Sequence, residues 1–400
     1  MNILYLCDEY PPGRHGGIGT VVQSLARQML KRGHRVIVVG FYDWGYGGKD
    51  EFDDQGVKVY RFRRKLDSSF FAKKDALIVR AAYRLLYAAG IFQWDISASL
   101  IEYKFFLETL IERFNIEIIE MPDFNEYVQY CRRYTPFPKL SKPTIVKLHG
   151  TIAYFLKETG QDVPSLIWEM EKTTIEQSTA LTSVSSYTAR KTAEYYSYKK
   201  PITVLYNGID SSITLSNVNK KELQVAFSGS LVAKKGIFQL IKAWNIVHEN
   251  IPNARLLIFG KGVLKRVKKY LKPGVESSVY FKGHVPGDEL YRNLAESQLA
   301  VYPSYAETFG MTVLEAMNLA TPVIYTTRAT GPEIISDGID GVLVDPDNVD
   351  ELAGKIIYLL NNPEICRQLS TNAKLSVKTK FDISITTQKN ISFYETILKK

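Results

Sequence analysis

Short apolar segments rich in β-forming residues alternate with segments of helical periodicity along almost the whole chain. This alternation is typical of parallel sheets whose strands are joined by crossover helices. The segments fall into two series, and each series predicts one doubly wound α/β sheet. The expected strands are residues 2–7, 35–40, 57–62, 116–121, 144–149 and 181–184 in the first series, and 223–228, 255–259, 279–282, 299–303, 322–326 and 341–344 in the second.

The length of the chain also favours two domains. Its 400 residues exceed one ordinary domain, so two domains of roughly 200 residues are expected. The boundary is expected near Asn207-Gly208, a turn sequence that the polar stretch 211–221 follows. Early in the first half, a helix is expected to begin at Thr20, as its N-cap, and to stop at Gly33.

Composition and net charge limit the classes of function that this protein can have. Cys7, Cys131 and Cys366 are too few and too far apart for a disulfide framework or a zinc site, and they fit a reducing compartment. The sequence opens on an expected strand without a signal peptide, which favours a cytoplasmic protein. The net charge of +9 indicates an anionic partner, either phosphorylated substrates or phospholipid head groups. Nucleic acid is disfavoured, because zinc-finger, RNA-binding and helix-turn-helix patterns are absent.

A strand-to-helix turn in the second half carries two carboxylates, Glu307 before the turn and Glu315 inside the helix. A helix N-terminus offers unpaired N–H groups and the positive end of the helix dipole, which favour a diphosphate. The amides of Gly310, Met311 and Thr312 would supply these groups. Glu315 could then accept hydrogen bonds from ribose hydroxyls, and Glu307 could face a sugar. Taken alone, the pattern also fits a solvated loop acid and a surface helix position.

The surroundings of this turn resemble glycosyltransferase family 4, a group of retaining transferases with the GT-B fold and an E-x7-E signature. A lone E-x7-E is weak evidence, but several motifs in one order along nearly the full length are strong evidence. They are Pro11-Pro12, His15-Gly16-Gly17-Ile18-Gly19, Gly33-His34-Arg35-Val36, His149-Gly150, Asn207-Gly208-Ile209-Asp210, Phe227-Ser228-Gly229-Ser230-Leu231 with Lys235-Gly236, Gly260-Lys261-Gly262, Glu307 with Glu315, and Gly338-Ile339-Asp340-Gly341.

The resemblance implies the GT-B architecture, in which two Rossmann-like doubly wound domains face a central cleft. An acceptor-side domain is then expected at 1–205, and a nucleotide-sugar-binding domain at 206–380. The resemblance also implies that a last helix, within 381–400, returns to the first domain. Ligands of open α/β sheets bind beyond the carboxyl ends of the strands, and this agrees with a site in such a cleft.

The resemblance gives roles to three residues of the first half. Gly16 and Gly17 follow the first strand, where small residues let the backbone approach a phosphate or sugar. His149 ends an expected strand and would form a hydrogen bond to the transferred sugar. A structural bend at the glycines and a packed histidine at the strand end are the alternatives.

Lys235 is expected to neutralise the leaving diphosphate. The neighbouring residues of this donor site are Ser230 and Phe309, together with the turn at 310–312. Ser230 departs from the family, which usually has Gly-Arg-Leu where this chain has Gly-Ser-Leu. One phosphate-facing cation is therefore missing, and Ser cannot replace the bidentate fork of Arg. Lys234 could substitute for it, or the chain could be a degenerate transferase.

No metal or other cofactor is expected. Asp345-Pro346-Asp347 formally matches an Asp-x-Asp metal motif, but it lies between an expected strand and an expected helix. Turn and N-cap chemistry explain both acids there, and the resembling family generally needs no such metal. Glycines at 260–262 and 283 resemble backbone regions that flank the nucleotide base.

The segment 61–94 is basic and contains aromatic residues, including Phe70 and Phe71. Its basic residues are Arg61, Arg63, Arg64, Lys65, Lys73, Lys74, Arg80 and Arg84. The pattern resembles a patch that binds an anionic membrane surface. A core helix with a solvated basic edge is the alternative. The arginines interrupt 76–94, so this segment should not span a bilayer.

These observations favour a retaining hexosyltransferase-type glycosyltransferase of polysaccharide biosynthesis. It would transfer a sugar from a nucleotide-diphosphate sugar, with UDP-sugar favoured, to a hydroxyl of a glycan or lipid-linked acceptor. We expect a cytoplasmic location, with peripheral contact at the inner face of the plasma membrane. Two alternatives remain, namely a glucan synthase or phosphorylase, and a noncatalytic protein that binds a nucleotide-sugar or a carbohydrate.

Overall fold

The structure, a computed structural model of the chain, describes residues 1–13, 16–73 and 76–399. The chain forms two compact units. Unit 1 comprises Met1–Val184, Thr188–Gly208 and Thr386–Lys400, and unit 2 comprises Ser185–Tyr187 and Ile209–Ile385.

Unit 1 is built on an eight-stranded sheet with the order β3-β4-β2-β1-β5-β6-β7-β8. Neighbouring strands run parallel, except for the antiparallel pair β3 and β4 at one edge. The strands are β1 (Asn2–Leu6), β2 (Arg35–Phe41), β3 (Glu51–Asp54), β4 (Val57–Phe62), β5 (Ile118–Pro122), β6 (Thr144–Leu148), β7 (Ala180–Ser183) and β8 (Ile202–Val204).

Helices cover both faces of this sheet. They are α1 (Gly17–Lys31), α2 (Leu77–Ala88), α3 (Ile91–Arg113), α4 (Ile152–Glu158), α5 (Ser165–Gln177), α6 (Ser186–Tyr196) and α14 (Ile383–Leu398), with the 3-10 turns η1 (Ser69–Ala72) and η2 (Glu126–Tyr130). Side chains alternate along β1, so that Ile3 and Tyr5 enter one apolar core and Leu4 and Leu6 enter the other. Both faces are therefore buried, as a doubly wound sheet requires.

Unit 2 contains a six-stranded, wholly parallel sheet with the order β11-β10-β9-β12-β13-β14. Its strands are β9 (Lys221–Ser228), β10 (Arg255–Phe259), β11 (Val279–Gly283), β12 (Ser297–Tyr302), β13 (Val323–Thr326) and β14 (Val342–Val344). Its helical elements are η3 (Ala233–Lys235), α7 (Ile237–Asn250), α8 (Leu264–Lys268), η4 (Glu276–Ser278), α9 (Gly287–Glu296), α10 (Met311–Asn318), α11 (Gly331–Ile334), α12 (Val349–Asn361), α13 (Pro363–Ser376) and η5 (Val377–Phe381). The predicted fold class, two doubly wound α/β domains, is confirmed.

The sequence did not predict the edge strands β3 and β8. Strand β3 has the sequence Glu-Phe-Asp-Asp and is largely exposed, because it pairs with one neighbour only, β4. Strand β8 has three residues and likewise pairs on one side, with β7. Edge strands of this kind carry little of the apolar patterning from which a strand is predicted.

The predicted N-cap at Thr20 is wrong. Helix α1 begins at Gly17, with Gly16 as its N-cap, and the Thr20 hydroxyl donates to the Gly16 carbonyl inside the first turn. A Cβ at Gly19 would lie 1.9 Å from the Glu9 carbonyl oxygen, so close packing requires glycine in this turn despite its low helix propensity. The predicted stop at Gly33 agrees with the structure, because α1 ends at Lys31 and Gly33 has a φ of 80°.

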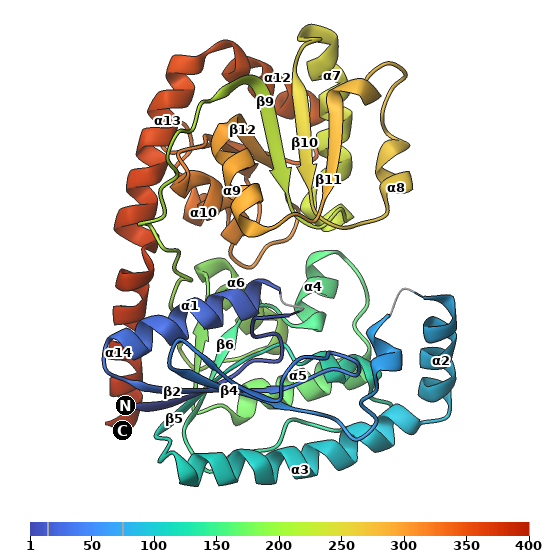
Figure 1. Cartoon of the computed structure of the whole chain (residues 1–400), viewed down its shortest axis with the longest axis vertical. Helices are drawn as coiled ribbons and strands as arrows, with labels where there is room; N and C mark the ends of the chain where they lie inside the picture. Colours follow the sequence, from blue (N-terminus) through green and yellow to red (C-terminus); the bar gives the residue numbers. More distant parts are fainter. Residues whose placement is uncertain (14–15, 74–75, 400) are drawn as a thin grey trace. The chain divides into compact units, whose positions relative to one another are not determined.

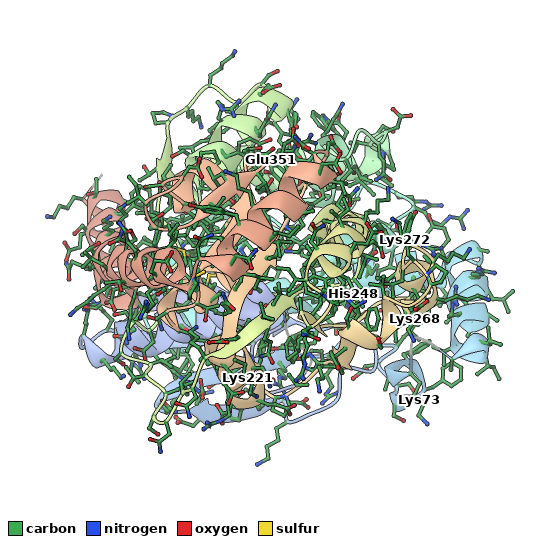
Figure 2. The ribbon with its side chains drawn as sticks, turned by 90° about the horizontal axis from the view of Figure 1, so that it is seen from above. Lys73, Lys221, His248, Lys268, Lys272 and Glu351 are labelled. Carbon is green, nitrogen blue, oxygen red and sulfur yellow. The ribbon has the colours of Figure 1, made fainter. Side chains whose placement is uncertain are left out.

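Basic side chains are also found on unit 2. Figure 2 labels Lys268 and Lys272, which belong to the segment between β10 and β11. Lys272 forms an ion pair with Glu249 at 2.7 Å, and Lys268 lies over the ring of Phe281. The positive charge of the chain is therefore not confined to the segment 61–94.

A buried polar network joins the C-terminal helix α14 to the sheet of unit 1. Figure 1 shows this helix, in red, beside the blue α1 and β2. The Tyr394 hydroxyl donates to Glu120 of β5 at 2.6 Å, and its oxygen lies 3.3 Å from the Tyr5 hydroxyl. The Lys147 ammonium donates to Asn390 Oδ1 at 3.0 Å and lies 3.5 Å from Glu120 Oε1. These contacts compensate the buried charges of β5 and β6 with groups from the end of the chain.

Replacing Tyr394 with Phe should lower the free energy of unfolding by about 1–3 kcal/mol, because the buried Glu120 carboxylate loses a donor. Urea unfolding followed by circular dichroism measures this change. The matched control is Tyr358→Phe on α12, where the side chain is exposed and the change should stay within about 0.5 kcal/mol. Equal stability of the two variants would contradict the role given to the network.

Candidate functional site

The turn between β12 and α10 has the geometry expected for an anion site. Gly310 is the N-cap of α10 with a φ of 111°, and a Cβ there would lie 2.7 Å from the Tyr325 hydroxyl. Glycine is therefore needed both for the backbone conformation and for space. The amide of Val313 bonds back to Gly310 at 3.0 Å, whereas those of Met311 and Thr312 precede the first helical hydrogen bond.

The structure brings together two residues that the sequence placed 72 positions apart. Lys235, at the end of η3, donates from Nζ to Oε1 of Glu307. The same carboxylate oxygen accepts from the Ser304 hydroxyl at 3.1 Å. Both side chains of the pair are mostly buried, with exposed fractions of 24% and 12%. The cation and the carboxylate that the sequence predicted for the donor site thus form an ion pair in unit 2.

Glu315 lies inside α10 and is half-buried. Burial raises the pKa of Glu315 from 4.5 to about 7, and the hydroxyl of Tyr291, 3.4 Å away on α9, lowers it slightly. Tyr291 and Ser304 were not predicted as site residues. Tyr291 reaches Glu315 from α9, 24 residues earlier, so the sequence gives little signal for it, whereas Ser304 is only three residues before Glu307 and lies in the same turn.

A cavity of about 340 Å³ opens at the carboxyl ends of β10 and β11. A Cβ at Gly260 would lie 1.9 Å from the Gly229 carbonyl oxygen, so the backbones meet directly at its edge. The lining residues are Leu231, Ile258, Gly260, Lys261, Gly262, Leu264, Phe281, Lys282 and Gly283. All three glycines predicted to flank a nucleotide base therefore surround one hollow: Gly260, Gly262 and Gly283.

The Asp-x-Asp sequence forms a turn held by an arginine. The Arg328 guanidinium donates to Asp345 at 2.8 Å and also to Asp347, and the amide of Asp347 donates to Asp345 at 3.0 Å. Tyr305 donates to Asp347 as well. In the described part of the chain, no group of three or more His, Cys, Asp or Glu side chains could hold a metal ion. That the chemistry needs no metal remains a prediction.

His149 lies at the end of β6 in unit 1. Its amide donates to Asp123 Oδ1 at 2.8 Å, and the amide of Gly150 donates to the other oxygen at 3.1 Å. Burial, and to a lesser extent nearby Lys147, lowers the pKa of His149 to about 3, so the ring is neutral at physiological pH. Burial raises the pKa of Asp123 to about 7, although the two amide hydrogen bonds oppose this shift.

The glycines after β1 differ in what surrounds them. A Cβ at Gly16 would lie 2.7 Å from the Glu9 carboxylate, whereas a Cβ at Gly17 would meet nothing within 4 Å. Packing therefore explains Gly16 but not Gly17, and close approach of a ligand remains the prediction for Gly17. His15 of the same motif lies outside the described residues.

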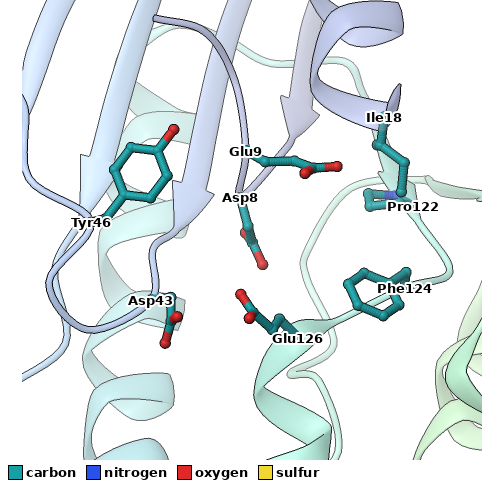
Figure 3. A pocket seen from close by; sticks show the side chains of 8 residues that line it. All are labelled: Asp8, Glu9, Ile18, Asp43, Tyr46, Pro122, Phe124 and Glu126. Carbon is teal, nitrogen blue, oxygen red and sulfur yellow. The ribbon is translucent and has the colours of Figure 1, made fainter. Parts of the chain in front are cut away.

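An acidic pocket of about 190 Å³ lies in unit 1, where β1, β2 and β5 end. Figure 3 shows the carboxylates of Asp8 and Glu126 pointing toward each other, with Asp43 to the left of Glu126. Burial raises the pKa of Asp8 to about 7, while the Phe41 amide and then Arg64 lower it. The lining residues are Asp8, Glu9, Ile18, Asp43, Tyr46, Pro122, Phe124 and Glu126. Sequence reasoning missed this pocket, although Asp8 and Asp43 each follow a predicted strand.

Two family models match the chain. "Glycosyltransferase Family 4" matches residues 15–213, and "Glycosyl transferases group 1" matches residues 211–376. N-acetyl-alpha-D-glucosaminyl L-malate synthase of Bacillus anthracis is 31% identical over 403 residues, which cover 96% of this chain and 93% of that protein. The chain belongs to glycosyltransferase family 4. It is a transferase.

Other relatives agree with this assignment. An uncharacterized glycosyltransferase of Methanocaldococcus jannaschii is 26% identical over 412 residues, covering 99% of this chain and 98% of the relative. Among solved structures, sucrose-phosphate synthase from Thermosynechococcus elongatus has a TM-score of 0.77 at 17% identity, with full coverage of both chains. HepE of Anabaena, solved with UDP-glucose, has a TM-score of 0.68 at 16% identity, covering 99% of this chain and all of HepE. At these identities the structures support the GT-B fold alone.

The family resemblance predicts an arginine where this chain has Ser230. The Ser230 side chain is exposed and cannot supply the missing positive charge. Lys234 lies beside Lys235 and Glu307, and burial lowers its pKa, as does Lys235, whereas Glu307 raises it. This lysine is therefore a cation close to the Lys235–Glu307 pair that could take the place of the expected arginine. Phe309 is buried behind the turn and contacts the ring of Phe381 rather than solvent.

The sequence predicted that Arg61 and Arg64 of this family 4 chain belong to a basic surface. This prediction is wrong for both residues, because their side chains are buried. Arg61 donates to the carbonyls of Tyr10 and Pro12, and Arg64 lies between aromatic rings of the core. Arg63 pairs with Asp50 and Asp67, and Lys65 pairs with Glu102 at 2.7 Å. Lys74 lies outside the described residues. None of the helices in the described ranges is long and apolar enough to cross a membrane.

Glu315→Gln should stabilise the ligand-free protein at high pH. Because the folded pKa of about 7 exceeds 4.5, the unfolded chain loses its proton first, and stability falls as pH rises from 4.5 to 7. At pH 8 the free energy of unfolding of the variant should exceed that of the native chain by up to about 3 kcal/mol. At pH 4 the two values should be equal. Urea unfolding at both pH values measures this. The exposed Glu364→Gln is the control, and a pH-independent difference for Glu315→Gln would contradict the argument.

Proposed function

We propose that this chain is a retaining glycosyltransferase that transfers a sugar from a UDP-sugar to a hydroxyl of a glycan or lipid-linked acceptor. The ion pair of Lys235 with Glu307, in the same unit as the turn at Gly310, is the observation that carries the proposal. We assign the donor to unit 2 and the acceptor to unit 1. We further propose a cytoplasmic location in contact with the inner face of the plasma membrane.

Donor binding uses the backbone of the β12–α10 turn. The first amides of α10, at Met311 and Thr312, would donate to the diphosphate, and Lys235 would neutralise it. Without donor, Glu307 neutralises Lys235. When the diphosphate binds, Lys235 gains a second anionic partner, and Glu307 can then accept hydrogen bonds from sugar hydroxyls. The ion pair would therefore keep the Lys235 ammonium and the Glu307 carboxylate in position before the donor binds.

The nucleoside is assigned to Glu315 and the cavity at Gly260. An ionised Glu315 accepts hydrogen bonds from ribose hydroxyls, and Tyr291 limits the directions in which its carboxylate can point. The cavity of about 340 Å³ offers apolar walls and backbone groups to a base. HepE of Anabaena was solved with UDP and with UDP-glucose, and this favours uridine as the first base to test.

The transfer step needs no nucleophile from the protein. The acceptor oxygen would attack the anomeric carbon as the bond from that carbon to the phosphate oxygen breaks. The acceptor proton would pass to the leaving phosphate on the same face, so the configuration is retained. Lys235 and the α10 amides would stabilise the charge of the departing diphosphate. We assign His149 to a hydrogen bond with the sugar, and its neutral ring suits that role.

The acidic pocket of unit 1 is the proposed place of the acceptor. Carboxylates accept hydrogen bonds from sugar hydroxyls, and several of them around one hollow disfavour an anionic group. An acceptor that presents neutral hydroxyls fits better there than a carboxylate acid. We therefore expect the acceptor of this chain to differ from that of its Bacillus anthracis relative, whose name specifies the anion malate.

A glucan synthase is the second candidate. Glycogen synthase of Mycobacterium tuberculosis is 24% identical over 405 residues, covering 96% of this chain and 91% of the relative. A relative that matches a shorter part of the chain, 25% identical over 160 residues, is named for a different polymer, as poly(glycerol-phosphate) alpha-glucosyltransferase of Bacillus subtilis. Product analysis with oligoglucan and with lipid-linked sugar acceptors separates the two candidates.

Lys235→Ala and Glu307→Ala should each reduce sugar transfer by about 10²–10³-fold, because each removes a charge that acts on the donor. A donor-consumption assay at saturating UDP-sugar measures this, after a thermal-shift screen has identified the donor. The matched control is the exposed ion pair of Lys221 with Glu296, also in unit 2, whose substitution should leave transfer unchanged. Native turnover by Glu307→Ala would remove the central assignment.

Transfer should survive chelation of metals, since Lys235 and backbone amides are assigned to the phosphates. The assay is donor consumption in metal-stripped buffer with EDTA, compared with the same buffer containing added Mn²⁺. Asp345→Asn and Asp347→Asn should retain activity under both conditions. Complete loss in EDTA with recovery in Mn²⁺ would assign these two acids to a metal instead.

A further inference from the structure

Two neighbouring helices of unit 1, α2 and α3, present apolar side chains to solvent. On α3 they are spaced by three, seven and four residues, so they lie on one side of the helix and form one stripe. On α2 only Val79 is buried, and the first and last turns both expose leucine. Figure 1 shows α3 along the lower border of unit 1, with α2 beside one end of it. The exposed residues are Leu77 (82%), Ile78 (70%), Leu85 (71%), Ile91 (37%), Trp94 (59%), Ile101 (62%) and Phe105 (70%).

The part of this apolar face that α2 and the first turn of α3 form carries positive charge only. Between residues 76 and 94 the sequence contains two arginines and no aspartate or glutamate. Arg80 and Arg84 are both exposed and lie one turn apart on α2. An apolar helix face with arginines at its border is typical of helices that lie in a membrane interface. The second half of the face also contains exposed Glu102 and Lys104 beside Ile101 and Phe105, so the single sign of charge belongs to residues 76–94.

A cavity of about 530 Å³ adjoins the same face, where α2 ends and α3 begins. Two of its lining residues are arginines, and a third, Trp94, also belongs to the apolar stripe. Arg132 is held by the carbonyl of Ala88, to which its guanidinium donates at 2.6 Å, whereas Arg133 is exposed. The lining residues are Ala89, Gly90, Gln93, Trp94, Ser97, Arg132 and Arg133.

We propose that the α2–α3 face rests on an anionic lipid bilayer and that the cavity beside it binds the phosphate of a phospholipid head group. Arg132 and Arg133 supply the positive charge, and the Ser97 hydroxyl supplies a donor. Gln93 positions both arginines, because its Oε1 accepts from their backbone amides. The apolar residues of α2 and α3 enter the boundary of the acyl chains, and Trp94 lies at head-group level. This deepens the proposed function, since it gives the transferase a surface from which to meet a lipid-linked acceptor.

The positive charge of the α2–α3 face favours a bilayer, rather than a second copy of the chain, as its binding partner. Two copies joined through this face would bring the same arginines against each other, and like charges across an interface disfavour association. A bilayer that contains phosphatidylglycerol supplies both the apolar layer and the negative charge. The same face therefore fits an anionic membrane in both of its properties.

Co-sedimentation with vesicles tests the proposal without any assay of transfer, so its failure is distinct from failure of the proposed function. The native chain should pellet with phosphatidylglycerol vesicles and not with phosphatidylcholine vesicles at low salt. The combined change Arg80→Gln, Arg84→Gln and Arg133→Gln should weaken binding about 100-fold, at about fivefold for each arginine. Removing the same charge from unit 2, with Lys265→Gln, Arg266→Gln and Lys269→Gln, is the matched control and should change binding little.

A second pair of variants tests the apolar contribution. Part of the binding should resist high salt, because apolar insertion is not screened. Leu77→Ser with Leu85→Ser should abolish this part, while Leu375→Ser, at an exposed position of α13, should retain it. Thermal unfolding confirms that the exposed substitutions leave the fold intact.

Three outcomes would overturn the proposal. One is equal pelleting with neutral and anionic vesicles, or with neither. Another is loss of vesicle binding in the unit 2 control to the same extent as in the arginine variant. The third is a shift from dimer to monomer in Leu77→Ser with Leu85→Ser, or a thermal shift with soluble glycerol phosphate, in a protein that binds no vesicles.

Discussion

Direct contact between two backbone turns in unit 2 determines the candidate donor site. A Cβ at Gly236 would lie 1.7 Å from the Pro303 carbonyl oxygen, and the amide of Tyr305 donates to the Lys234 carbonyl at 2.8 Å. The turns after β9 and β12 therefore touch without side chains between them. Because β9 and β12 are adjacent parallel strands, their carboxyl ends meet at one edge of the sheet. This contact places Lys235 within reach of Glu307.

The same edge of each sheet collects ionisable groups that burial has shifted. Asp8 and His149 follow strands of unit 1, and Glu315 lies in the helix after β12 of unit 2. Burial raises the pKa of each carboxyl to about 7 and lowers that of the histidine to about 3. All three shifts favour the neutral form, because each group has lost water without gaining a full counter-charge. Such groups are poised to accept or donate hydrogen bonds when a ligand replaces the missing water.

Sequence reasoning failed where the deciding fact was a neighbour distant along the chain. Arg61 and Arg64 look like surface residues in a basic segment, yet carbonyls and aromatic rings from other segments surround them. Thr20 is a good N-cap by residue type, but contact of Gly19 with Glu9 starts the helix one turn earlier. The acidic pocket escaped notice for the same reason, since its carboxylates come from the ends of separate strands.

The sequence by itself determined the two α/β sheets, the order of the family motifs and the glycine turn at Gly310. These follow from local periodicity and from backbone conformations that only certain residues adopt, and both are properties of short segments. Only the tertiary structure decided that Lys235 pairs with Glu307, that Arg61 is buried and that Trp94 is exposed. Pairing and burial depend on which distant segments pack together, and composition cannot specify that packing. The apolar residues of α2 and α3 make this plain, because their spacing fits a buried face and a solvent-exposed one equally well.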